Sequence, residues 1–426
     1  MKRKIEEHLL KWKNDTNKRP LMIYGNKQVG KTYSVLKFGE EYYKNTVYFN
    51  TDNNIELYKI FKKERTIDRI ISHLSVLSSE SILEGDTLIV FDNLTDPDIA
   101  SGIKVFGRNK HNYHIILISS LKENLKKFKC EEFQYRMMMS LDFEEYLTAI
   151  DNAQLIDFIK SSFRNNKPMP FHSLALEYFD DFLMTGGMPE SVELSIKQRN
   201  KLLLNSVYDK IIDAYKKEIS TLDNLIDITR SIEVLDSVPF QLQKPNKKFQ
   251  YGLIKTGGRS KDYEKSINFL YNNGFVYRSN KISTVKSPLS SCKDVDNFKL
   301  YYNDTGLLFS RMYLNKNKFL SSNKARYTIL ENMIAITLMN EGYNLYYYQS
   351  EGKAEVNFVV QTRVGRVIPI EIVNKDMSKA KSLTLFMNKF DIKEAIRITD
   401  DNFSFKKGVK YIPAYALFCL KDIIWN

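Results

Sequence analysis

The sequence predicts an α/β protein of more than one domain, and three observations support this class. Short apolar runs alternate with amphipathic helical patterns over residues 1–150, which is typical of a parallel sheet covered on both faces by helices. Residues 141 to about 235 place apolar side chains at helical spacing. Residues 327–419 combine strand patterns with two helices. With 426 residues, the chain is long enough for two or three domains, each with its own core.

The composition limits the classes of protein to consider. An apolar fraction of 43% and an aromatic fraction of 13% indicate a folded chain. The net charge of +13 fits an anionic partner such as DNA and equally fits solvated lysine-rich faces. Cys130, Cys292 and Cys419 form no pair motif, which predicts reduced thiols in a cytoplasmic protein. Neither a membrane-spanning apolar run nor a signal-peptide core is found, so no membrane association is expected.

The first domain is expected over residues 1–150. An amphipathic helix over residues 1–16 precedes the alternating strands and helices. Strands are expected at residues 21–24, 47–49, 87–91 and 114–118, with helices such as 55–63 and 66–77 between them. Because parallel strands present their carboxyl ends at one edge of the sheet, a ligand is expected at that edge.

A glycine-rich loop follows the first of these strands. Its sequence is Gly25-Asn26-Lys27-Gln28-Val29-Gly30-Lys31-Thr32, which fits the Walker A pattern of a P-loop. The glycines let successive backbone N–H groups turn toward one phosphate chain, and the next helix adds the positive end of its dipole. All eight residues are predicted to contact ATP, with Lys31 acting on the β- and γ-phosphates and Thr32 holding Mg²⁺. The alternative is a chance match, which the flanking strand and helix disfavour.

Two further strand ends are predicted to complete this site. The apolar run at residues 87–91 ends in Asp92, whose carboxylate is expected to hold Mg²⁺ and to act with Lys31 in catalysis. The strand that includes residues 115–118 leads to Ser120, which is predicted to sense the γ-phosphate or, alternatively, to lie in a simple strand-end turn.

Residues 151–235 are predicted to form a helical domain, and residues 236–320 a winged-helix-like domain. In the first, Gly186 and Gly187 end one helix and Pro189 begins the next. In the second, helix, turn, helix and β-hairpin follow in order, and basic residues alternate with aromatic ones. A basic wing can lie along phosphates, and a purely structural winged helix explains the pattern equally well. The predicted nucleic-acid contacts are Lys244, Lys247, Lys248, Arg259 and Lys261.

Residues 321–426 are predicted to form a separate α/β domain. A helix at 327–341, strands at 344–349, 354–361 and 366–373, a helix at 379–389 and strands at 395–398 and 411–419 are expected. This order matches the core of restriction-endonuclease-like nucleases, which need an Asp on one strand and a Glu-x-Lys on the next to hold Mg²⁺ and to orient the attacking water.

Ordered motifs along nearly the whole chain carry a family resemblance. They lie at residues 24–32, 87–92, 142–147, 186–190, 239–242, 246–249, 298–308, 331–332, 355–358 and 368–371. On these motifs the sequence resembles the bacterial and archaeal predicted AAA-type ATPases whose C-terminal half is a domain of unknown function. The resemblance implies a nucleotide-binding domain, a helical and winged-helix middle and a nuclease-like end.

The chain departs from the family pattern at the nuclease positions. The family pattern has Asp where Asn357 stands and Lys where Val373 stands. Of the acids, Glu331 and Glu371 remain, and Lys375 is a candidate replacement for the missing lysine. These positions predict a degenerate, inactive nuclease site.

The chain also departs from the pattern beside Asp92, and this departure shapes the functional hypotheses. The family usually has Glu where Asn93 stands, and an amide cannot accept a proton from water. By the same resemblance, Arg136 is predicted to contact the γ-phosphate.

The favoured hypothesis is a slow ATPase that acts as a switch, with ATP and Mg²⁺ controlling engagement of DNA or a protein partner. The alternatives are a winged-helix DNA-binding regulator with incidental nucleotide binding, and a metal-dependent nuclease. The sequence does not predict the oligomeric state.

Overall fold

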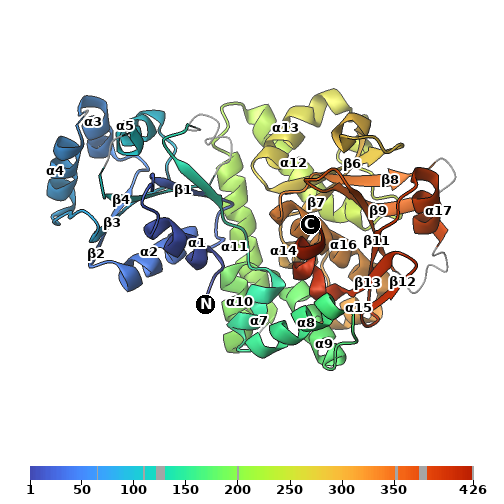
Figure 1. Ribbon diagram of the computed structural model, residues 1–426. Coiled ribbons are helices and arrows are strands. Elements are labelled where there is room, and N and C mark those ends of the chain that lie inside the picture. Colours follow the sequence, from blue (N-terminus) through green and yellow to red (C-terminus); the bar gives the residue numbers. More distant parts are fainter. Residues whose placement is uncertain are drawn as a thin grey trace. The chain divides into compact units, whose positions relative to one another are not determined.

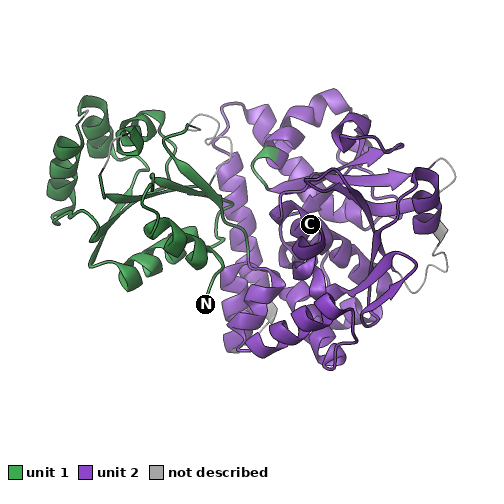
Figure 2. Cartoon of the chain, in the orientation of Figure 1, with its two compact units in different colours: residues 1–140, 272–274 green, residues 141–271, 275–426 purple. Residues whose placement is uncertain are grey.

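The computed structural model describes residues 1–64, 66–108, 111–120, 130–198, 201–350, 354–373 and 381–424, and Figure 1 shows its course. The chain divides into two compact units. Unit 1 contains residues 1–140 and 272–274, and unit 2 contains residues 141–271 and 275–426 (Figure 2). The finer division into four domains stays a prediction.

Unit 1 is built on a five-stranded sheet in the order β2-β3-β4-β1-β5, in which every pair is parallel. Its strands are β1 (Leu21–Tyr24), β2 (Asn45–Asn50), β3 (Thr87–Asp92), β4 (His114–Ser119) and β5 (Gln134–Met137). Its helices are α1 (Ile5–Lys13), α2 (Lys31–Tyr42), α3 (Ile55–Lys63), α4 (Ile67–Ser78) and α5 (Pro97–Arg108). The four predicted strands are present, and β5 is an addition. The strand order brings the carboxyl ends of β1, β4 and β3 next to one another.

The core of unit 1 explains why these short runs form strands. Every residue of β3 and β4 is buried, as expected of central strands in a sheet covered on both faces. Phe49 on β2 and Phe91 on β3 stack with ring centroids 5.4 Å apart. Phe61 of α3 and Phe106 of α5 lie in the same hydrophobic cluster. This packing fixes the strand ends that carry the polar residues of the site.

Unit 2 begins with helices, in agreement with the predicted helical segment. They are α7 (Phe143–Ala149), α8 (Ala153–Asn165), α9 (His172–Thr185), α10 (Pro189–Gln198), α11 (Lys201–Ile219) and α12 (Leu225–Leu242). The predicted Gly-Gly turn separates α9 from α10. Gly186 there has φ 67° and ψ −172°, a conformation that is essentially restricted to glycine.

An eight-stranded mixed sheet follows in the order β12-β13-β11-β10-β9-β8-β6-β7. Its strands are β6 (Val276–Ile282), β7 (Lys293–Tyr302), β8 (Leu345–Gln349), β9 (Glu355–Gln361), β10 (Val367–Ile372), β11 (Ala395–Thr399), β12 (Ser404–Lys406) and β13 (Val409–Pro413). The accompanying helices include α13 (Ser260–Asn272), α14 (Thr305–Arg311), α15 (Lys316–Ser321), α16 (Asn323–Asn340) and α17 (Lys381–Phe390).

Two features of this sheet differ from the sequence expectation. The β6–β7 hairpin, expected to be a wing, pairs through β6 with β8 and so extends the sheet. The boundary predicted near residue 320 therefore divides strands that share one sheet. The strand expected at 411–419 ends at Pro413, and Ala414–Cys419 forms a 3₁₀ helix. That run is buried on all sides, so its apolar sequence lacks the periodicity that separates a strand from a helix.

Candidate functional site

The glycine-rich loop has the backbone of an anion-binding turn. Gly25 has φ 153°, and a Cβ there would meet the Met138 carbonyl oxygen at 2.0 Å. Gly30 has φ 91° and caps the N-terminus of α2, with no side-chain hydrogen bond to the first turn. The first N–H groups of α2 therefore have no side-chain cap, which is the arrangement that favours a phosphate.

Lys31 places its ammonium group over this loop. Its Nζ donates to the carbonyl oxygens of Gly25 at 2.7 Å and Asn26 at 2.8 Å. The side chain is buried. The Lys31 ammonium thus lies beside the backbone turn of the loop, where a positive charge favours phosphate binding.

The oxygen atoms predicted to hold magnesium lie together. The Thr32 hydroxyl donates to Asp92 Oδ2 at 2.6 Å, and the Tyr48 hydroxyl donates to the same oxygen at 3.0 Å. Burial, together with the Asp92 carboxylate, raises the pKa of Tyr48 to about 12, so its hydroxyl stays protonated and acts as a donor. A hydroxyl and a carboxylate in contact fit the oxygen ligands that Mg²⁺ prefers.

The position after Asp92 carries no acid. Asn93 has φ 58°, its backbone N–H donates to Asp92 Oδ1 at 2.7 Å, and its side-chain amide donates to Asn50 Oδ1 at 3.2 Å. Asp96 is engaged in a turn, because its Oδ1 accepts from the backbone N–H groups of Asp98 and Ile99 at the start of α5.

The other two predicted nucleotide contacts differ in their placement. Ser120 follows β4, which lies between β1 and β3 in the sheet, so it stands at the edge that carries the loop and Asp92. Arg136 lies on β5, and its guanidinium contacts His8 of α1. Burial and the nearby Arg136 charge lower the pKa of His8. The roles of Ser120 and Arg136 toward a γ-phosphate stay predictions.

Sequence reasoning did not assign two residues that shape this site. Tyr48 fixes the Asp92 carboxylate, as described above. Arg3 is buried, and its guanidinium donates to the carbonyl oxygens of Val29 at 3.0 Å and Met139 at 2.7 Å. Both contacts join segments distant in sequence, so no local pattern signals them.

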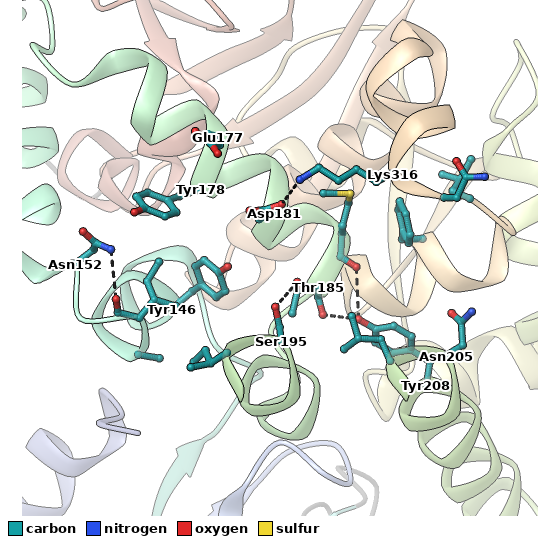
Figure 3. Close-up of a pocket in the computed structure, with 18 of the residues that line it drawn as sticks. Tyr146, Asn152, Glu177, Tyr178, Asp181, Thr185, Ser195, Asn205, Tyr208 and Lys316 are labelled. Atoms are coloured by element: carbon teal, nitrogen blue, oxygen red, sulfur yellow. Dashed lines mark hydrogen bonds and ion pairs between the residues drawn. The ribbon is translucent and has the colours of Figure 1, made fainter. Parts of the chain in front are cut away.

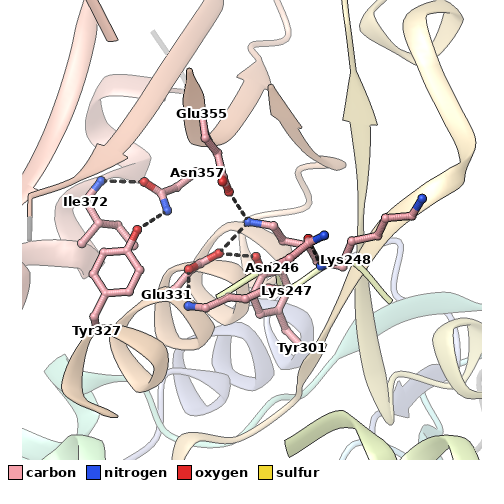
Figure 4. Close-up of polar contacts among 10 residues, drawn as sticks. Asn246, Lys247, Lys248, Tyr301, Tyr327, Glu331, Glu355, Asn357 and Ile372 are labelled. Atoms are coloured by element: carbon pink, nitrogen blue, oxygen red, sulfur yellow. Dashed lines mark hydrogen bonds and ion pairs between the residues drawn. The ribbon is translucent and has the colours of Figure 1, made fainter. Parts of the chain in front are cut away.

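Glu331, one of the degenerate nuclease positions, lies in a buried ion-pair network in unit 2 (Figure 4). Glu331 of α16 accepts from Lys247 at 2.6 Å, from Lys299 at 3.2 Å and from the Tyr301 hydroxyl at 2.7 Å. Lys299 also donates to Glu355 at 2.6 Å. Burial opposes the charge of Glu331, but the two lysines outweigh it and lower its pKa to about 2. The acid is thus neutralised by ammonium groups of the chain itself.

The remaining nuclease positions do not fit a metal. The Asn357 amide donates to the Tyr327 hydroxyl at 2.6 Å and accepts from the Ile372 backbone N–H at 3.0 Å. Glu371 accepts from Arg397 Nε at 2.8 Å, and Val373 offers no charge. Among the described residues, no group of three or more His, Cys, Asp or Glu side chains is arranged to hold a metal ion. Lys375 lies outside the described residues.

The predicted nucleic-acid contacts require one correction. Lys247 is an internal ion-pair partner with a side chain 10% exposed, so it is not available to a phosphate backbone. Lys244 lies over the Phe240 ring at 4.3 Å, Lys248 is half-buried, and Arg259 and Lys261 are exposed.

The parallel sheet, the loop and Asp92 together define unit 1 as a P-loop NTPase domain of the AAA class. Comparisons with family models agree. An AAA domain matches residues 17–147, a domain of unknown function (DUF8612) matches residues 176–318, and a second domain of unknown function (DUF4143) matches residues 328–417. The chain thus combines a segment that matches an AAA domain with a C-terminal segment that matches DUF4143. No curated protein matches it.

Solved structures show only distant similarity. A Signal Transduction ATPase with Numerous Domains from Pyrococcus horikoshii, which has a tetratricopeptide repeat sensor, is 13% identical with a TM-score of 0.31, and the match covers 80% of this chain but 45% of that one. The Aeropyrum pernix ORC1 protein in complex with DNA is 12% identical with a TM-score of 0.30, over 74% of this chain and 91% of that one. Drosophila ORC bound to DNA is 12% identical with a TM-score of 0.27, and the match covers 69% of this chain and 90% of that one.

Within the described residues, no helix has the length and apolarity to cross a bilayer.

Proposed function

We propose that this protein is a Mg-ATP-dependent switch that binds nucleotide firmly and hydrolyses it slowly. One contrast supports the proposal. The groups proposed to bind nucleotide lie close to one another, since Lys31 contacts the loop carbonyls and Thr32 contacts Asp92 at 2.6 Å. The group that would accept a proton from water is absent from its expected position, where Asn93 stands.

Different residues of unit 1 would hold the phosphates and the magnesium ion of Mg-ATP. The backbone N–H groups of residues 25–32 and the Lys31 ammonium would hold the phosphates, and Thr32 and Asp92 would hold Mg²⁺. Bound magnesium supplies neutralisation of the negative charge that develops on the phosphates. Asn93 can hydrogen-bond a water molecule but cannot take its proton.

Phosphate release by an Asn93→Glu variant tests the slow-hydrolysis proposal. We expect the variant to release phosphate at least about tenfold faster than the wild type, because a general base is restored. Because residue 93 has a left-handed backbone conformation, a glutamate there lowers the free energy of unfolding by about 1 kcal/mol. Asn93→Gln, which has the same strain and size but no carboxylate, is therefore the control. The proposal is wrong if the wild type hydrolyses ATP as fast as Asn93→Glu does.

A second candidate function is DNA binding by unit 2, which the net charge of +13 and the exposed Arg259 and Lys261 favour. Both residues lie at or just before the start of α13, where Asp262 and Glu264 add opposing charge. Duplex binding should weaken steeply with salt, and Arg259→Glu with Lys261→Glu should weaken it on every sequence. Lys393→Glu, at an exposed site on the segment before β11, is the matched control. Undetectable binding at low salt would remove this candidate.

The nuclease alternative is not supported, because the remaining acids of that site, Glu331 and Glu371, are paired with basic side chains.

A further inference from the structure

A cavity of about 860 Å³ lies among the helices of unit 2. Its walls come from α7, α9, α10, α11 and α14 and from the start of α15 (Figure 3). Its volume falls in the range of small-molecule sites, which is about 300–1,000 Å³. None of the nucleotide-binding residues lines it.

The charged lining of the cavity is mainly acidic. Among the described residues that line it, Asp151, Glu177 and Asp181 are acidic and Lys316 alone is basic. Glu177 and Asp181 are four residues apart on α9, so they lie one turn apart on the same face. The described lining is therefore net negative in a chain whose net charge is +13.

Aromatic and small polar side chains form the rest of the wall. Tyr146, Tyr178 and Tyr208 line the cavity, and the Tyr208 hydroxyl donates to the Thr185 carbonyl oxygen at 2.6 Å. Thr185 Oγ1 in turn donates to Ser195 Oγ at 3.4 Å. Tyr146 and Tyr208 are buried, at 4% and 1% exposed, whereas Tyr178 is half-buried and is the tyrosine of the three whose ring a cation can reach.

Lys316 already brings a cation to this wall. Its Nζ lies 3.2 Å from Asp181 Oδ1, and Figure 3 shows the side chain directed toward that carboxylate. Both side chains are about 40% exposed, at 40% for Lys316 and 39% for Asp181. A half-exposed pair of this kind is weak enough for a competing cation to replace it.

We propose that this cavity binds a small organic cation, an ammonium or guanidinium group on an apolar body, which displaces Lys316 from Asp181. An anion would meet three carboxylates and one engaged lysine. A bare metal ion is disfavoured, because the described residues hold no cluster of three or more His, Cys, Asp or Glu side chains arranged to hold one. An organic cation matches both the acidic charge and the Tyr178 ring.

Titration calorimetry of the full chain with 2-phenylethylammonium tests the proposal. Saturable binding with a Kd of about 1 mM or lower is expected. The neutral 2-phenylethanol and the anionic phenylacetate carry the same phenyl group on a two-carbon chain. Both should bind at least about tenfold more weakly than 2-phenylethylammonium.

Variants with opposite expected effects locate the site. Asp181→Asn and Glu177→Gln should each weaken binding about fivefold, whereas Lys316→Met should strengthen it about fivefold by freeing Asp181. Glu193→Gln removes an exposed acid of α10 that pairs with Lys197 outside the cavity, and it should change nothing. Equal binding of the three probes, or no saturable binding by Lys316→Met, would overturn the proposal.

Discussion

At the scale of single residues, Tyr48 is the unexpected part of the nucleotide site. Its hydroxyl and that of Thr32 share Asp92 Oδ2 and so orient the carboxylate expected to hold Mg²⁺. Tyr48→Phe removes one of these donors. We expect it to weaken Mg-ATP binding by about 1 kcal/mol, or about fivefold, because a hydrogen bond to a charged group is lost at a partly exposed position.

Calorimetry with and without Mg²⁺ checks this prediction. The loss should appear only with Mg²⁺, because Tyr48 acts through Asp92. Tyr33→Phe is the matched control, since Tyr33 follows Thr32 and is 63% exposed. A loss of equal size without Mg²⁺, or an equal loss in the control, would contradict the role given to Tyr48.

At the scale of elements, the turn between α9 and α10 is held by one buried acid. Asp304 accepts from the Gly187 backbone N–H at 2.7 Å and from the Leu307 N–H at 3.0 Å at the start of α14. A Cβ on Gly186 would meet Asp304 Oδ1 at 2.3 Å, and the backbone there has φ 67°. Gly186→Ala should therefore destabilise unit 2 by about 3 kcal/mol, from strain and overlap together.

Denaturant unfolding measures this cost against a second glycine. Gly342 also has a positive φ, +83°, but a Cβ there would meet nothing within 4 Å. Gly342→Ala should cost only about 1 kcal/mol, which is the strain alone. Equal losses in the two variants would show that the contact with Asp304 does not matter.

The elements also show how far the sequence could lead. The loop at residues 25–32 was predictable because one short segment carries its glycines, Lys31 and the Thr32 hydroxyl. Asp92 was predictable because it directly follows an apolar strand pattern. The contacts of Arg3, Tyr48 and Lys247 were not, because each depends on a partner at least 26 residues away. For the same reason, the pairing of β6 with β8 could not be predicted from a local hairpin pattern.

At the scale of the whole molecule, we expect that the stability of unit 2 can be changed without changing the affinity of unit 1 for Mg-ATP. Glu331 binds the buried ammonium groups of Lys247 and Lys299, so Glu331→Gln leaves Lys247 without its paired carboxylate and Lys299 with Glu355 alone. We expect a loss of about 3 kcal/mol or more from unit 2, with Mg-ATP affinity unchanged. Unfolding curves and calorimetry of the same variant check both parts, and a changed ATP affinity would contradict the separation.

The pH dependence of unit 2 should follow from the same acid. The pKa of Glu331 is lowered from its ordinary value of 4.5 to about 2 in the folded chain. Its contribution to stability is therefore fully present above pH 4.5 and is lost as the pH falls toward 2. The difference in stability between the wild type and Glu331→Gln should shrink over that window, and a constant difference would contradict the assignment.

The most direct test of the account is the affinity for ATP with Mg²⁺ by titration calorimetry, compared between the wild type and Lys31→Ala. The account predicts that the wild type binds and that Lys31→Ala binds at least about tenfold more weakly, because the ammonium over the loop is lost. An unchanged unfolding midpoint for the variant would show that the loss is local. Equal affinity of the two proteins, or no binding by the wild type, would contradict the claim that this loop holds a nucleotide.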